Sequence, residues 1–206
     1  MPSELEAVAA EAAGCTRCRL HQSRTQVVFG QGDPHADLMF VGEAPGFHED
    51  RQGVPFVGPS GQLLNRLLEG IGLRREDVYI CNVVKSRPPQ NRDPQPDEIA
   101  ACRPWLDAQI RLVDPKVVVT LGNFAAKTLL ETTTGITRLR GQTYPFQGRV
   151  LLPTFHPAAA LHAQGRRTAG PSPLEAMEGD FKVLAELLAA RAPVDDDRPT
   201  EQLGLF

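Results

Sequence analysis

The chain has 206 residues, with 22 Lys and Arg against 25 Asp and Glu, a net charge of −3. This length can bury a sizeable core in one domain, and the charge excludes a uniformly basic nucleic-acid binder. No apolar run approaches the length of a membrane span, and the acidic N-terminus is unlike an export signal. We expect a cytoplasmic monomer.

Acidic and basic residues are unevenly distributed along the chain. Residues 193–206 hold four acids and one base, so residues 1–192 keep 21 of each. We predict one folded domain over 1–192 and a disordered acidic tail over 193–206. The bases cluster as Lys85, Arg87 and Arg92, as Arg138, Arg140 and Arg149, and as Arg166 and Arg167. Such clusters are either solvated surface or phosphate contacts.

Strand and helix patterns alternate along the domain. Nearly continuous apolar runs, typical of strands covered on both faces, lie at 37–42, 77–84, 116–122 and 149–155. Helical patterns lie up to residue 13 and at 60–72, 96–113, 123–130 and 172–192. The alternation predicts an α/β fold, a three-layer α/β/α sandwich with a central, mainly parallel four-stranded sheet.

The segments that follow the predicted strands are rich in glycine, proline and polar residues. They read GEAPGFHEDRQGVPFVGPSG, NVVKSRPPQNR, LGN and FHPAAALHAQGRR in chain order. Ligands bind beyond the carboxyl ends of the strands in an open parallel sheet. We therefore expect the functional site at this edge.

The four cysteines suggest two different roles. Cys15 and Cys18 have metal-ligand spacing in CTRC, and Cys102 lies in a later helix that could meet them. A redox pair is the alternative, but the segment precedes the first strand, which favours a metal. Cys81 lies in an apolar strand and is interpreted as a small buried hydrophobe.

Five motifs together resemble the family 4 uracil-DNA glycosylases, the iron-sulfur members of their superfamily. These are GEAPG, PFVGPSGQLLN, NVVKSRPPQNR, LG after the third strand, and TFHPAAAL, across about residues 12–190. The resemblance implies an enzyme that flips uracil out of DNA and hydrolyses its N-glycosidic bond, the first step of base excision repair. That reaction leaves a positive sugar and a uracil anion, and the site must stabilise both.

The resemblance also implies roles for individual residues. Phe56 stacks on the flipped base, and Asn82 reads uracil O4 and N3–H through its amide. His156 donates a hydrogen bond to O2 and stabilises the anion. Each residue also has a structural alternative: Phe56 could be a core phenylalanine, Asn82 a strand-end cap and His156 a structural histidine.

Two carboxylates each have alternative roles. The resemblance puts Glu43 in the water-activating motif, where it places water or balances the sugar charge. The related family 1 enzymes carry their aspartate one position later, where this chain has Ala44. Backbone N–H groups around Ala44 could bind the base. Glu49 could line the pocket near uracil C5 and exclude the methyl group of thymine.

Several residues are expected to contact the DNA. Ser60 and Gly61 open a helix whose N–H groups suit a phosphate, although Ser60 could equally be an ordinary cap. Leu161 is a candidate wedge for the vacated stack. The basic candidates for phosphate contacts are Lys85, Arg87, Arg92, Arg166 and Arg167.

The family's 4Fe-4S cluster has four cysteine ligands, which match Cys15, Cys18, position 86 and Cys102. Position 86 is Ser86 in this chain. Either Ser86 or water completes the fourth iron, or Cys81 serves, or the cluster is labile or absent. We favour three cysteines with a weaker fourth ligand, in a cluster that organises loops over the DNA backbone.

The chain ends in QLGLF, which resembles the pentapeptide that binds the bacterial sliding clamp. Gln202, Leu203, Leu205 and Phe206 would dock on the clamp through the flexible linker. Alternatively, these residues fold back onto the domain.

Two other functions stay open at this stage. One is a non-turnover protein that binds uracil-containing or single-stranded DNA and carries an iron-sulfur cluster. The other is a zinc-dependent nucleotide hydrolase. A relative that traps uracil-DNA covalently carries a basic insertion after the second strand, and its absence here favours turnover.

Overall fold

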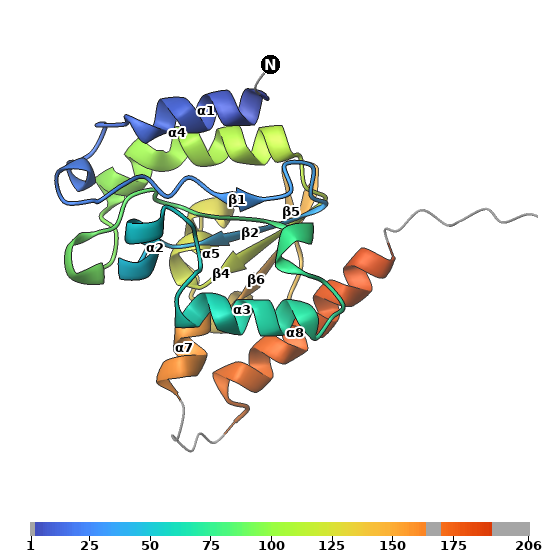
Figure 1. The fold of residues 1–206 in the computed structure, drawn as a ribbon. Helices are drawn as coiled ribbons and strands as arrows, with labels where there is room; N and C mark the ends of the chain where they lie inside the picture. Colours follow the sequence, from blue (N-terminus) through green and yellow to red (C-terminus); the bar gives the residue numbers. More distant parts are fainter. Residues whose placement is uncertain (1–2, 164–169, 191–206) are drawn as a thin grey trace, which may run out of the picture.

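A computed structural model describes residues 3–163 and 170–190 and shows a central sheet with helices on both faces (Figure 1). The six strands run in the order β1-β3-β2-β4-β6-β5. Their bounds are β1 Gln31–Gly32, β2 Leu38–Gly42, β3 Tyr79–Asn82, β4 Val117–Leu121, β5 Tyr144–Phe146 and β6 Arg149–Thr154. The central four, β3, β2, β4 and β6, are parallel and are the four predicted strands.

Two short antiparallel strands extend the predicted four-stranded sheet at its edges. β1 pairs with β3, and β5 pairs with β6. They are two and three residues long. Segments this short do not produce a periodic pattern, which explains why the prediction had no edge strands.

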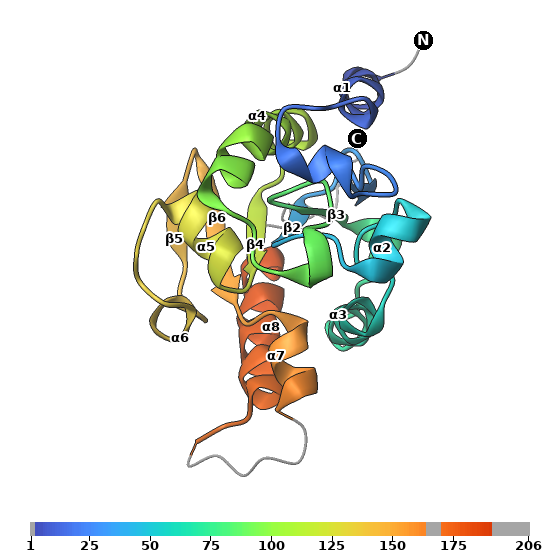
Figure 2. The ribbon, with the colours of Figure 1, turned by 90° about the vertical axis from the view of Figure 1, so that its left-hand side faces the viewer.

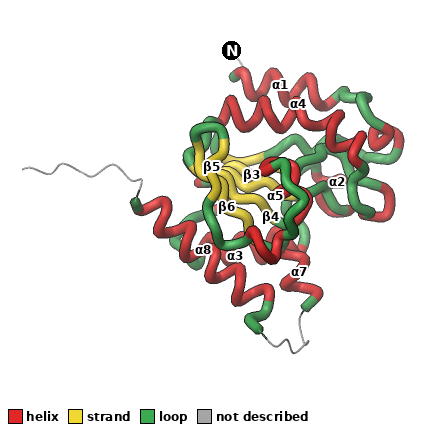
Figure 3. Tube along the Cα trace, turned by 180° about the vertical axis from the view of Figure 1, so that it is seen from behind, coloured by secondary structure: helices red, strands yellow, loops and turns green. Residues whose placement is uncertain are grey.

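Helices cover both faces of the sheet in three layers (Figures 2 and 3). Their bounds are α1 Glu4–Ala13, α2 Phe47–Gln52, α3 Pro59–Glu69, α4 Pro96–Val113, α5 Asn123–Leu130, α6 Ile136–Leu139, α7 Pro157–His162 and α8 Pro173–Ala189, with 3-10 turns at Arg19–Gln22, Arg75–Asp77 and Pro89–Asn91. One core cluster joins one sheet face to α1, α4 and α5, and a second joins the other face to α3, α7 and α8. The predicted three-layer architecture is confirmed.

Side chains alternate between the two clusters along each central strand. Met39 and Val41 of β2 pack in the first cluster, and Leu38 and Phe40 pack in the second. The strands are buried on both sides, which is why their sequence is continuously apolar. Within the described residues, no helix is long and apolar enough to cross a membrane.

The predicted helices agree closely with the observed ones. Those at 96–113 and 123–130 are confirmed at both ends. The helix predicted at 60–72 spans Pro59–Glu69, because Pro59 suits the first helical position and glycines follow Glu69. The helix predicted at 172–192 is α8, which begins after the capping Ser172.

Candidate active site

A cavity of about 610 Å³ opens where the parallel strands end. Its walls come from the segment after β2, from the end of β3, from the loop that follows β3 and from the start of α7. This is the edge at which the sequence predicts a site. The predicted site residues that line it are Glu43, Ala44, Glu49, Phe56, Ser60, Asn82, Arg92 and His156.

Asn82 is the last residue of β3 and is only 2 % exposed. Its Oδ1 atom has no hydrogen-bond partner among the described residues. A buried acceptor without a donor costs about 1–3 kcal/mol, so this atom is suited to an N–H group brought by a ligand. Cys81 packs in the cluster on the opposite sheet face, which confirms that it points away from the cavity.

A glycine next to Asn82 keeps the cavity open. A Cβ atom on Gly42 would lie 2.4 Å from Asn82 Oδ1 and 2.5 Å from Phe56 Cζ. Both contacts are far below van der Waals distance. Any side chain at Gly42 would therefore displace the two residues predicted to hold the base.

Phe56 has a strained backbone that its neighbours hold in place. Its φ angle is 52°, in the left-handed region that aromatic residues rarely occupy. The Arg75 guanidinium donates a hydrogen bond of 3.0 Å to the Phe56 carbonyl and another to the Pro55 carbonyl. No sequence pattern singles out Arg75, because its contacts depend on the tertiary fold.

Glu49 holds the other side of the Phe56 loop. Its Oε1 accepts the backbone N–H groups of Val57 at 2.9 Å and Gly58 at 2.8 Å. Side chains therefore bind both kinds of backbone group in this loop: Glu49 accepts from its N–H groups, and Arg75 donates to its carbonyls. Glu49 lines the cavity, but this oxygen is already occupied by the loop.

His156 caps the N-terminus of α7 and faces Phe56, with the two ring centroids 5.7 Å apart. Its Nδ1 accepts the Ala158 N–H at 3.1 Å, so the ring proton lies on Nε2. Burial lowers the pKa of His156 to about 4. The ring is therefore a neutral hydrogen-bond donor at neutral pH.

Glu43 lies in the same cavity, directly after β2. Burial raises its pKa to about 7, and the nearby negative charge of Asp93 contributes. Glu43 is therefore partly protonated at neutral pH. Asp93 also lines the cavity and was not predicted as a site residue, since nothing in the sequence marks this carboxylate on a long loop.

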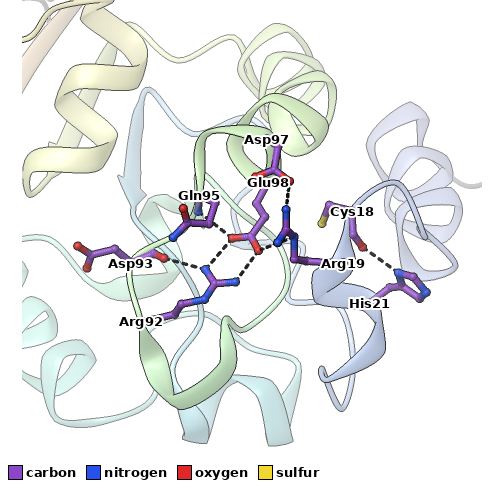
Figure 4. A network of polar contacts seen from close by, with 8 residues as sticks. All are labelled: Cys18, Arg19, His21, Arg92, Asp93, Gln95, Asp97 and Glu98. Carbon is purple, nitrogen blue, oxygen red and sulfur yellow. Dashed lines mark hydrogen bonds and ion pairs between the residues drawn. The ribbon is translucent and has the colours of Figure 1, made fainter.

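Arg92 anchors the loop after β3 to α4 (Figure 4). Its two terminal nitrogens bind both oxygens of Glu98, at 2.6 and 2.9 Å, and the Glu98 side chain is fully buried. Beside it, Arg19 binds Asp97 at 2.7 Å. The predicted contact of Arg92 with phosphate stays a prediction: the guanidinium is paired with Glu98, while the side chain is 33 % exposed and lines the cavity.

Two predicted DNA contacts are corrected. Lys85 is 2 % exposed, because its ammonium is buried against Asn82 and Gln109, so it cannot reach a phosphate. Gly61 is also buried, and a Cβ on it would lie 1.8 Å from the Phe56 carbonyl oxygen. Its role is to allow α3 to pack closely on the Phe56 loop.

The remaining predicted DNA contacts differ in position. Ser60 lines the cavity but does not cap α3, because Gly58 is the N-cap residue. Leu161 is half-buried against the second core cluster, which weakens the case for a free wedge, while the neighbouring His162 lines the cavity. Arg166, Arg167 and the tail residues Gln202, Leu203, Leu205 and Phe206 lie outside the described residues.

The three predicted cysteine ligands lie in one region between the N-terminal segment and α4. Burial raises the pKa of the Cys102 thiol, and the nearby Cys18 and Cys15 add to this effect. Trp105 Nε1–H points at Cys15 Sγ, 3.4 Å away. The backbone N–H of Lys85 is also 3.4 Å from Cys102 Sγ.

Ser86 follows Lys85 in the chain and is 3 % exposed. Its hydroxyl accepts a hydrogen bond of 3.2 Å from Arg24. Over the described ranges, no three His, Cys, Asp or Glu side chains are arranged to hold a single metal ion. Three thiols in one region, with N–H groups directed at two of the sulfur atoms, are donors of the kind that hold an iron-sulfur cluster.

The chain is similar to known uracil-DNA glycosylases over most of its length. The model of the uracil DNA glycosylase superfamily matches residues 29–182. A type-4 uracil-DNA glycosylase of Sulfurisphaera tokodaii is 45 % identical over 192 residues, which cover 89 % of this chain and 84 % of the relative. The type-4 enzyme of Archaeoglobus fulgidus is 43 % identical, with coverages of 92 % and 96 %.

A third relative agrees with these two. The type-4 uracil-DNA glycosylase of Thermotoga maritima is 48 % identical over 159 residues, which cover 76 % of this chain and 83 % of the relative. The resemblance inferred from the five motifs is confirmed. The chain belongs to the uracil DNA glycosylase superfamily, in its type-4 group.

Proposed function

We propose that this protein excises uracil from DNA by hydrolysing the bond between the base and the sugar. The observation that carries the proposal is the unpaired, buried Oδ1 atom of Asn82, in a cavity that Phe56 and a neutral His156 also line. Membership of the type-4 group makes this activity the expected one. This membership does not support the alternative function of a zinc-dependent nucleotide hydrolase.

Phe56 and Asn82 would bind the extruded base. The Phe56 ring offers a face for stacking, and the clamp of Glu49 and Arg75 keeps that face in place. Asn82 Oδ1 would accept uracil N3–H while its amide N–H donates to O4. Cytosine presents the reverse pattern at these atoms, so both groups of Asn82 would stay unpaired, which is costly in a buried site.

His156 would stabilise the uracil anion as the glycosidic bond breaks. Its Nε2–H is free to donate, because Nδ1 is occupied by the Ala158 N–H. A neutral donor favours the charge that develops on uracil O2 without first protonating the base. Such a donor is directed at charge that grows in the transition state, where it contributes most to rate.

Glu43 is the residue best placed to act on the sugar and water. In its ionised form it would balance the positive sugar or orient the attacking water, with the Ala44 backbone beside it as a base contact. Its raised pKa of about 7 means that the ionised fraction changes steeply near neutral pH.

Cys15, Cys18 and Cys102 would hold a 4Fe-4S cluster, with Ser86 nearest to the fourth position. A bound cluster would supply a rigid cross-link and one-electron redox capacity. The protein makes its own contacts to these ligands. The backbone N–H of Lys85 points at Cys102 and the Trp105 indole N–H at Cys15, and Arg24 donates a hydrogen bond to the Ser86 hydroxyl. They would fix the segment from Asn82 to Ser86 between the cluster and the cavity.

The wider setting is part of the proposal. Residues 1–192 would act as one monomeric domain in the cytoplasm. The tail from 193 to 206 would carry QLGLF to the bacterial sliding clamp. Deleting residues 202–206 should abolish clamp pull-down and leave excision on free oligonucleotides intact, and unchanged pull-down would refute this part.

Two variants test the proposed roles within the cavity. Asn82→Ala and His156→Ala should each lose uracil excision while keeping the fold, measured by circular dichroism and thermal unfolding. Full excision by either variant would refute the role assigned to that residue. A wild-type protein that binds uracil-containing DNA without releasing base would instead support the non-turnover binding protein.

A further inference from the structure

Phe47, the first residue of α2, lies at the cavity wall with 46 % of its surface exposed. It is the only large hydrophobic side chain among the described residues that is this exposed. Phe47 therefore presents an aromatic face to solvent beside the cavity, and burying a phenylalanine side chain is worth about 1.5–3 kcal/mol. The uracil-binding roles assigned above do not use Phe47.

Two arginines lie against the Phe47 ring. The guanidinium carbon of Arg87 is 5.2 Å from the ring centroid, and that of Arg51 is 5.6 Å away. The ring is still half-exposed, so the two cations leave part of it free. Arg87 also donates a hydrogen bond of 2.7 Å to Asn91 Oδ1, which fixes its direction.

Neither guanidinium has an ion-pair partner in the part of the chain that the structure describes. The basic residues that form salt bridges in the described part of the chain are Arg17, Arg19, Arg74, Arg92, Arg103, Arg111, Lys116, Arg140 and Arg149. Arg51 and Arg87 are not among them. Two guanidiniums beside one ring, neither in an ion pair, can both attract the same anion. The arrangement suits a phosphate next to an aromatic face.

We propose that Phe47, Arg51 and Arg87 bind the DNA strand next to the extruded uracil. Phe47 stacks on the base of an adjacent nucleotide, and the two arginines bind its phosphate. DNA is favoured over a protein partner because Phe47 lines the cavity in which the proposed function holds the uracil, so a nucleotide joined to that uracil is within reach of the ring. This inference rests on the proposed binding of uracil-containing DNA in the cavity.

A double-mutant cycle tests the stacking contact. The ligand is a single-stranded oligonucleotide with a stable tetrahydrofuran abasic analogue in place of the uracil nucleotide. Four versions are prepared. One keeps both neighbouring bases, one lacks the base on the 5′ side, one lacks the base on the 3′ side, and one lacks both. Dissociation constants are measured for wild type and Phe47→Ala.

We expect Phe47→Ala to weaken binding about 5- to 150-fold. Removal of one neighbouring base should weaken binding by wild type and have little further effect on Phe47→Ala. If base removal on either side weakens both proteins equally, or if Phe47→Ala binds like wild type, the stacking contact is refuted. Thermal unfolding of Phe47→Ala checks that the fold is intact.

The salt dependence of binding tests the arginines. Arg51→Ala and Arg87→Ala should each lower the slope of log K against log salt by about 0.7, the value for one single-strand phosphate contact. Arg74→Ala is the matched control, since Arg74 is exposed and paired with Asp77. Unchanged slopes in both variants would refute the phosphate contact.

Uracil release by the same wild-type preparation separates this inference from the proposed function. A protein that releases uracil but shows no coupling at Phe47 refutes only the inference. A protein that binds the analogue but releases no uracil refutes the proposed function instead.

Discussion

The ammonium of Lys85 donates a hydrogen bond of 2.5 Å to the backbone carbonyl of Asn82. It also donates to Gln109 Oε1 at 2.5 Å, and Gln109 in turn donates to the Phe29 carbonyl and the Tyr79 hydroxyl. This buried network supports the end of β3 from the side opposite the cavity. The position of the base-reading amide therefore depends on a lysine that contacts no base.

Replacing Lys85 by Met should lower both stability and activity. The substitution keeps the length of the side chain but leaves two buried acceptors unpaired, at about 1–3 kcal/mol each. We expect a lower thermal midpoint and a fall in excision of about tenfold or more, because Asn82 loses its support. The exposed Lys182→Met is the control, and wild-type values for Lys85→Met would contradict this account.

His156 should titrate near pH 4 and carry its proton on Nε2 at neutral pH. Nitrogen NMR of labelled histidine distinguishes the two tautomers and the imidazolium. Removing one such hydrogen-bond donor typically lowers kcat about 10²- to 10³-fold, and His156→Ala should lose a similar factor. An imidazolium that persists above pH 6 would contradict the neutral-donor mechanism.

The rate of excision should rise with pH as Glu43 ionises around pH 7. Burial is the main cause of the raised pKa, and Asp93 adds a like charge that opposes ionisation. Asp93→Asn should therefore lower the pKa and move the acidic limb of the pH profile to lower pH. Asp107→Asn, remote from the cavity, should leave the limb in place.

Glu43→Gln should excise uracil at a reduced rate that does not change with pH around pH 7, because the variant has no carboxyl group to ionise at this position. If wild type shows no limb near pH 7, or if Asp93→Asn moves the limb to higher pH, then Glu43 is not the group whose ionisation controls the rate.

Ser86→Cys should increase the retention of an iron-sulfur cluster. The substitution supplies a fourth thiolate one residue after Lys85, whose backbone N–H points at Cys102 Sγ. The present hydroxyl is a weaker ligand and is held by Arg24. Iron and sulfide per chain, and the decay of visible absorbance in air, measure retention without reference to activity. Equal loss of iron from both proteins would place the fourth ligand elsewhere.

The sequence patterns predicted the parts of the fold that depend on local chemistry. The continuous apolar runs located all four parallel strands, and the strand period placed Cys81 and Asn82 on opposite faces. The polar segments after these strands located the cavity. These successes share a cause: each depends on a short stretch of chain and on a known sheet geometry.

The sequence patterns did not predict contacts between basic side chains and polar partners that are distant in the chain. Lys85 and Arg92 are basic residues in a proline-rich loop and look like phosphate contacts. Their actual partners, Gln109 and Glu98, are on α4, and only the tertiary fold brings them together. Arg75 was missed for the same reason, since the carbonyls that it binds lie about 20 residues earlier in the chain.

The most direct test of the central claim is the release of free uracil from a uracil-containing oligonucleotide with enzyme limiting, alongside thymine- and cytosine-containing controls. We expect several molecules of uracil released per molecule of protein and no release of thymine or cytosine. Binding without release, or a single release per protein, would contradict a turnover enzyme. Comparable release of cytosine would contradict base reading by Asn82.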